Sequence, residues 1–165
     1  AGVPAWVISG IEAAGRLTLF KRITLTASAT WSDSEITSGL EGHVGNRVPH
    51  VPALDLDLGA LLKLGPWLRL RYGFRYTEGS FESPTNIFLS PPRQSHSLSA
   101  RLSPAPDLPW LSIEIKNLTD EQLYVRHRDP ANPQPDDLVV IFAEDFRGNP
   151  LPGRAFYVNL GWSPP

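Results

Sequence analysis

The residues best suited to chemistry in this sequence lie in one long polar stretch, residues 119–152. It combines aromatic rings with basic and acidic side chains. Six of them are candidate ligand-binding residues: Tyr124, Arg126, His127, Arg128, Phe142 and Arg147. Mixed charge beside aromatic rings suits capture of a charged solute such as a metal chelate, because binding residues concentrate on loops held by a rigid scaffold. A loop packed over its neighbours would use the same residue types, and the two interpretations stand about equal.

No set of residues predicts catalysis or a resident metal. The four histidines are scattered without metal-ligand spacing, at His43, His50, His96 and His127. Cysteine is absent, which excludes disulfides and thiolate metal sites. Gly39, Gly42 and Gly45 follow a predicted strand but open no helix, so they do not predict a phosphate cradle. We therefore expect no enzyme activity, no cofactor and no metal site.

A second set of charged residues alternates with apolar ones between residues 54 and 76. Asp55 and Asp57 alternate with leucines, and after a turn at 64–66 three arginines alternate with leucines and aromatic rings. A period of two is the period of a β-strand, so the two runs predict a hairpin with one apolar and one charged face. Pairing about the turn places the two aspartates across from Arg71 and Arg75.

The same alternation predicts seven strands, at residues 11–19, 23–31, 54–62, 68–76, 97–102, 111–116 and 156–162. The connections 20–22, 64–66 and 103–109 are short, whereas 33–52, 77–93 and 119–152 are long and rich in Gly, Pro, Asn and Asp. Successive connections of an up-and-down meander fall at opposite ends, so the short turns share one end and the long loops the other. The predicted fold class is all-β, an antiparallel up-and-down meander of about seven strands, and this segregation is typical of transmembrane β-barrels.

Aromatic residues and composition agree with that fold. Trp31 and Tyr76 end strands beside long loops, and Trp67 and Trp110 begin strands after short turns, as in the two aromatic girdles of a barrel. The formal charge of −2 gives no electrostatic case for nucleic acid. No apolar run approaches the ~20 residues of a transmembrane helix. A chain of 165 residues that starts at Ala1 and lacks Met suggests a piece of a longer polypeptide.

Several short motifs, in order along the chain, resemble those of one membrane-protein family. They are Gly10-Ile11-Glu12, Val48-Pro49-His50-Val51-Pro52-Ala53, Ile113-Glu114-Ile115-Lys116-Asn117-Leu118-Thr119-Asp120-Glu121 with Tyr124, Pro152-Gly153-Arg154-Ala155-Phe156, and Gly161-Trp162. In these residues the sequence is similar to the C-terminal part of TonB-dependent outer-membrane receptors. Pro164 departs from the family, which usually carries a terminal Phe there.

The resemblance implies a place in a larger assembly. Residues 1–165 would form the C-terminal section of the receptor's transmembrane β-barrel, with the plug domain and N-terminal strands absent. The implied function is uptake of a scarce nutrient such as a ferric siderophore across the bacterial outer membrane. The implied partners are the remaining barrel strands and plug, outer-membrane lipid and lipopolysaccharide, the barrel-assembly machinery and, through the plug, TonB.

In such a barrel the charged strand faces would line the lumen. The expected wall residues are Asp55, Asp57, Arg69, Arg71, Arg75, Arg101, Glu114 and Lys116. We favour a cross-strand ladder of salt bridges along this wall over contact with a ligand or plug. Two other functions stay open: a soluble all-β sandwich that acts as a binding module, and a small passive porin-like barrel.

Overall fold

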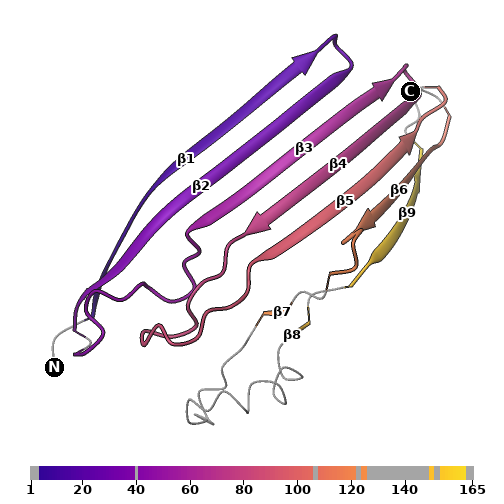
Figure 1. Ribbon diagram of the computed structural model, residues 1–165. Coiled ribbons are helices and arrows are strands. Elements are labelled where there is room, and N and C mark those ends of the chain that lie inside the picture. The colour runs from indigo at the N-terminus through magenta and orange to yellow at the C-terminus, as the bar shows by residue number, and fades with distance from the viewer. Residues whose placement is uncertain are drawn as a thin grey trace.

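The main body of the protein is one antiparallel sheet. The computed structural model describes residues 4–39, 41–105, 108–121, 124–125, 149–150 and 153–162. Seven strands lie in chain order across the sheet: β1 (Ala5–Leu19), β2 (Ile23–Ser38), β3 (Leu54–Leu64), β4 (Leu68–Thr77), β5 (Arg93–Leu102), β6 (Trp110–Lys116) and β9 (Ala155–Gly161). The short strands β7 (Tyr124–Val125) and β8 (Asn149–Pro150) pair separately. The predicted seven-stranded meander is confirmed, and β7 and β8 are an addition to it (Figure 1).

Tight turns set the register of the sheet. Leu64 pairs with Leu68, so the turn between β3 and β4 is Gly65–Trp67, one residue later than predicted. Gly65 has φ of 70°, a left-handed conformation that a glycine adopts without steric cost. The three residues between β1 and β2 close a similar turn. The short turns lie at one end of the sheet and the long connections at the other (Figure 1).

Each row of paired residues lies on one face of the sheet. One apolar row crosses all seven strands: Leu17, Leu25, Ala60, Tyr72, Leu98, Ile115 and Phe156. The neighbouring rows on the other face carry mostly Thr, Ser, Gly and charged residues, with Leu61, Ala155 and Tyr157 as exceptions. The alternation read from the sequence therefore gives a sheet with one apolar and one polar face.

The apolar face has no second layer of structure packed on it within the described residues. Ile113 is 45% exposed and Leu160 is 76% exposed, and Leu25, Leu58 and Leu98 are exposed as well. A β-sandwich would bury these side chains between two sheets. The sandwich architecture is therefore wrong for the described sheet, which is a single seven-stranded meander.

The first hairpin extends well beyond its neighbour. Trp31 lies opposite Leu54, the first residue of β3, but β2 continues to Ser38 and stays paired with β1 down to Ala5. At ~3.4 Å per residue this projection, from Trp31 to Ser38, measures about 24 Å. The strand was predicted to end at Trp31, because the apolar alternation gives way there to Asp33 and Glu35. Backbone pairing with β1 continues regardless of that change.

The buried core lies at the long-loop end. Among the described residues the buried hydrophobic side chains are Ile36, Val48 and Ala53, with exposures of 0%, 3% and 8%. Ile36 belongs to the projecting end of β2, and the other two belong to the loop that follows it. In the described part of the chain, no helix has the length and apolar character needed to span a membrane.

Candidate functional site

One ion pair stands on the polar face where the sequence predicted it. Asp57 lies opposite Arg75, and the Arg75 Nε donates a hydrogen bond of 2.8 Å to Asp57 Oδ1. The two side chains are 48% and 69% exposed, respectively, so water screens their attraction. This pair confirms one contact of the predicted salt-bridge ladder.

The other predicted contact of that hairpin is wrong. Asp55 lies opposite Thr77, and Arg71 lies opposite Leu61. Because the turn is centred on Pro66, Asp57 falls opposite Arg75 and its neighbours must fall opposite Thr77 and Gly73. Asp55 and Arg71 share the polar face as expected. They do not meet, because Arg71 lies opposite Leu61, six residues along β3 from Asp55.

A row of like charges replaces the ladder near the short turns. Lys63 lies directly opposite Arg69, which lies directly opposite Arg101. Arg71 follows two residues along β4 on the same face. We call these four residues the basic band: Lys63, Arg69, Arg71 and Arg101. All four are exposed, and no ion pair to a described residue involves any of them.

Lys63 was missed as a wall residue. Its position in the sequence could have identified it, because Lys63 is two residues beyond Leu61 and therefore lies on the same face as Asp55 and Asp57. Arg101 has one further contact, since its guanidinium carbon lies 4.1 Å from the ring centroid of Trp110. A cation over an aromatic face is attracted by the ring quadrupole, which holds Arg101 against the wall.

The last two predicted wall residues lie on β6. Glu114 is opposite Ser99 on one side and Tyr157 on the other. Lys116 is opposite Ser97, and its ammonium nitrogen lies 4.9 Å from the ring centroid of Tyr157. Neither forms an ion pair with a described residue, so a continuous ladder of salt bridges is absent from the described wall.

His96 stands on the apolar face of the sheet, in the row of Leu58 and Phe74. The His96 Nδ1 lies 2.7 Å from the Tyr72 hydroxyl, and the Phe74 ring centroid lies 4.9 Å from the imidazole centroid. The hydrogen bond satisfies an imidazole that stands among apolar neighbours. This contact accounts for His96 without a metal. Among the described residues, no group of three or more His, Asp or Glu is arranged to hold a metal ion.

At the opposite end of the sheet, the first long loop folds back on β2. The Ile36 amide donates to the Asn46 carbonyl at 2.8 Å, and the Gly45 amide donates to the Ile36 carbonyl at 2.9 Å. The Val48 amide donates to the buried Ser34 Oγ at 3.3 Å. At this fold-back the Ile36 side chain is completely buried.

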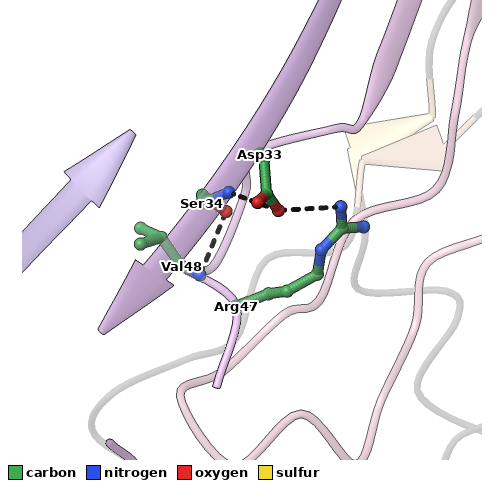
Figure 2. A network of polar contacts seen from close by, with 4 residues as sticks. All are labelled: Asp33, Ser34, Arg47 and Val48. Atoms are coloured by element: carbon green, nitrogen blue, oxygen red, sulfur yellow. Dashed lines mark hydrogen bonds and ion pairs between the residues drawn. The ribbon is translucent and has the colours of Figure 1, made fainter. Parts of the chain in front are cut away.

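Figure 2 shows the polar contacts around this fold-back. The Asp33 Oδ1 accepts a hydrogen bond of 3.1 Å from the Ser34 amide and lies 3.6 Å from an Arg47 guanidinium nitrogen. The Ser34 hydroxyl points to the Val48 amide. Asp33 and Ser34 of β2 thus contact Arg47 and Val48 of the loop, respectively.

The second long loop docks against the first. The Asn46 side-chain amide donates to the Pro84 carbonyl at 2.7 Å, and the His50 amide donates to the Phe81 carbonyl at 2.8 Å. The His50 ring nitrogen also lies 3.8 Å from Glu82. We call the end of β2 together with residues 41–53 and 78–92 the loop platform. Sequence reasoning marked both segments as loops but did not predict that they pack together.

Hydrogen bonds join the two ends of the third long connection, which links β6 to β9. The Asn117 side chain donates to the Glu121 carbonyl at 2.7 Å and accepts from the Glu121 amide at 3.0 Å. The Asp120 carboxylate accepts a bond of 2.8 Å from the Arg154 amide. The two C-terminal motifs of the sequence analysis therefore meet in space.

The candidate ligand-binding residues belong to this connection. Tyr124 lies in β7 opposite Pro150, and its side chain falls outside the described part of the structure. The other five candidates, Arg126, His127, Arg128, Phe142 and Arg147, also lie outside the described residues. Their role in binding stays a prediction.

Comparisons with known proteins place the sheet in a known fold. No family model and no curated protein sequence matches the chain. Among solved structures, the siderophore receptor PiuA from Acinetobacter baumannii matches with 23% identity and a TM-score of 0.65, covering 74% of this chain and 19% of that one. The ferric yersiniabactin uptake receptor FyuA from Yersinia pestis matches with 16% identity and a TM-score of 0.65, covering 76% and 21%.

These matches define the class of architecture. The chain has the fold of one section of the β-barrel of such receptors, and it spans about a fifth of their length. The resemblance to TonB-dependent receptors drawn from the sequence motifs agrees with this fold. Both matched proteins are named as uptake or siderophore receptors, and at this level of identity the likeness concerns the fold.

Proposed function

We propose that this chain is the C-terminal barrel section of an outer-membrane receptor that takes up a scarce nutrient such as a ferric siderophore. Uptake is energised through TonB, and no bond is made or broken. The observation that carries the proposal is the seven-stranded meander with one apolar and one polar face, in a fold shared with two siderophore or ferric-chelate receptors.

The apolar face supports a lipid-facing role. Its leucine, isoleucine and aromatic side chains are exposed and no second layer covers them in the described structure. Hydrocarbon chains remove such surface from water as effectively as a protein core does. In the bacterial outer membrane the short turns then face the periplasm and the long loops face outward.

The loops supply the capture surface in this proposal. The loop platform holds two of them rigidly, and the third carries the mixed charge and aromatic rings expected of a chelate site. Tyr124, Arg126, His127, Arg128, Phe142 and Arg147 would contact the ligand, with the arginines facing its anionic oxygens. The remaining strands, the plug, lipopolysaccharide and the barrel-assembly machinery are the other proposed partners.

Uptake in cells tests the proposal. A strain that lacks the gene carrying this chain should lose uptake of one radioactive ferric siderophore from a panel, and the restored gene should recover it. Uptake should also stop when TonB is deleted or the proton gradient is collapsed, because the transport is energised. Uptake that persists without TonB and without the gradient would favour a passive barrel instead.

A matched pair of variants separates binding from folding. Replacing Arg126 and Arg128 by Gln should weaken cell-surface binding of the chelate at least tenfold. The control replaces Lys21 and Arg22 by Gln in the short turn at the other end of the sheet, and it should leave binding unchanged. Equal binding by both variants would remove these arginines from the site.

A further inference from the structure

The turn between β1 and β2 has an unusual backbone for its sequence. The Arg22 amide donates to the Leu19 carbonyl at 3.0 Å, so Phe20 and Lys21 are the two central residues of a tight turn. Their φ angles are 49° and 57°, in the left-handed region that residues with a Cβ adopt at a steric cost. Asn and Gly are the usual residues in such a turn. The chain instead keeps two large side chains there.

This turn displays the Phe20 ring at the end of the sheet. Phe20 is 86% exposed, the highest value among the exposed large hydrophobic residues that the structure describes. It directly follows Leu19, the last residue of β1, which is exposed on the apolar face in the row of Ile23. The exposed apolar surface of the wall thus continues to the tip of the turn. Covering such a ring removes apolar surface from water, which is favourable.

The charges at this end of the sheet are all positive in the described residues. From the row of Leu19 to the tips of the short turns, the described residues are 19–23, 62–70, 100–105, 108–113 and 158–162. They contain no carboxylate, and their cations are Lys21, Arg22, Lys63, Arg69 and Arg101. The last three belong to the basic band on the polar face, whereas Lys21 and Arg22 lie in the turn beside the Phe20 ring. A partner that covers this ring therefore meets positive charge.

We propose that Phe20, Lys21 and Arg22 form an interfacial anchor that binds phospholipid headgroups of the periplasmic leaflet. This proposal rests on the barrel placement proposed above, which puts the short turns at the inner surface of the outer membrane. The Phe20 ring enters the boundary between acyl chains and headgroups, and the two cations bind phosphate oxygens. Anionic headgroups are preferred, because they lack the ammonium group that would repel Lys21 and Arg22.

The anchor explains why the turn keeps its costly sequence. An Asn-Gly turn would relieve the backbone at both central positions, but it would remove the ring and one of the two cations. A lipid partner is favoured over a protein because the Phe20 ring continues the surface that faces hydrocarbon in the proposed placement.

Photochemical cross-linking in cells tests the contact directly. The photoreactive residue benzoylphenylalanine replaces Phe20 in the complete polypeptide that contains this chain, and the molecule joined on irradiation is identified by mass spectrometry. We expect phospholipid, at a yield at least fivefold above that of the same probe at Val44, which is exposed in the loop platform. The probe at Leu58, near the middle of β3, should also join lipid and reports the barrel placement itself.

Charge variants test the headgroup preference. The protein carrying the probe is reconstituted in vesicles of phosphatidylglycerol and phosphatidylethanolamine in equal parts. The ratio of phosphatidylglycerol to phosphatidylethanolamine joined at Phe20 should exceed the ratio at Leu58 at least threefold. The double variant Lys21→Gln with Arg22→Gln should remove this preference. The matched double variant Arg47→Gln with Arg93→Gln, at the long-loop end, should keep it. Retention of the folded, heat-modifiable barrel on gels confirms that the variants are assembled.

Three results would overturn the anchor: a probe at Phe20 that joins protein or lipopolysaccharide instead of phospholipid, a phospholipid yield no higher than at Val44, or a headgroup ratio that Lys21→Gln with Arg22→Gln does not change. If the probe at Leu58 also joins no lipid, the barrel placement fails together with the anchor. A protein that forms the expected links but transports no chelate would refute the transport function and leave the anchor established.

Discussion

The sheet and the loop platform are held together in different ways. In the sheet, ladders of backbone hydrogen bonds join neighbouring strands while large apolar side chains remain exposed on one face. In the loop platform, Ile36 and Val48 are buried and side chains bond to backbone groups of another segment. The platform is thus a small packed core, and the sheet is a single wall.

The difference identifies what each region needs from its surroundings. A packed core removes apolar surface from water by itself. On the membrane placement proposed above, hydrocarbon covers the exposed apolar face of the wall, and every strand in the membrane must also find pairing partners. Substitutions that separate these two requirements test the comparison.

The largest effect is expected from a charge on the apolar face of the wall. Leu58→Arg, near the middle of β3, should destabilise the membrane-inserted protein by about 2–4 kcal/mol, because the guanidinium enters hydrocarbon. Ser28→Arg, on the polar face of β2 opposite Asp57, is the control and should cost less than about 0.5 kcal/mol. Urea unfolding from lipid vesicles measures both. Equal losses would show that the two faces meet the same medium.

The next effect is a cavity in the loop platform. Val48→Ala should destabilise the platform by about 2 kcal/mol, because two methyl groups leave a site that is 3% exposed. Val44→Ala lies in the same loop at 57% exposure and should have almost no effect. Hydrogen exchange at the Ile36 and Gly45 amides reports the local opening. Equal exchange in both variants would show that the platform is not packed around Val48 in the membrane-inserted protein.

A smaller effect follows from removing one buried acceptor of the platform. Ser34→Ala leaves the Val48 amide without its partner and should cost about 1 kcal/mol. Ser28→Ala, on the same face of β2 but over the wall, should change nothing measurable. Faster exchange of the Val48 amide alone is the expected signature. Unchanged exchange at Val48 would mean that water replaces the hydroxyl.

The sequence predicted the wall better than the platform for a physical reason. Strand alternation is local, so the repeats around Leu56, Leu70 and Ile113 were enough to place seven strands and their faces. The projecting end of β2 was missed because its side chains change character after Trp31 while the backbone goes on pairing. The contact of Asn46 with Pro84 depends on two loops far apart in sequence, and no local pattern encodes it.

Charges on the wall were predicted by face but not by partner. The turn lies one residue later than predicted. Asp57 therefore pairs with Arg75, and Asp55 pairs with Thr77. The same register places Lys63, Arg69 and Arg101 opposite one another. Alternation predicts the face on which a residue lies, but the position of the turn decides which residue lies opposite it. The candidate residues of the third loop have no periodic pattern that fixes their positions.

The smallest effect is expected from the wall's one ion pair. Asp57→Asn should cost no more than about 0.5–1 kcal/mol, because both side chains stand largely in water. The cost should shrink further at high salt, since exposed charges are screened within about 10 Å at 0.1 M ionic strength. A double-mutant cycle with Arg75→Gln isolates the pair energy. A coupling above about 2 kcal/mol would mean that water is excluded from around the pair and that something covers the polar face over Asp57.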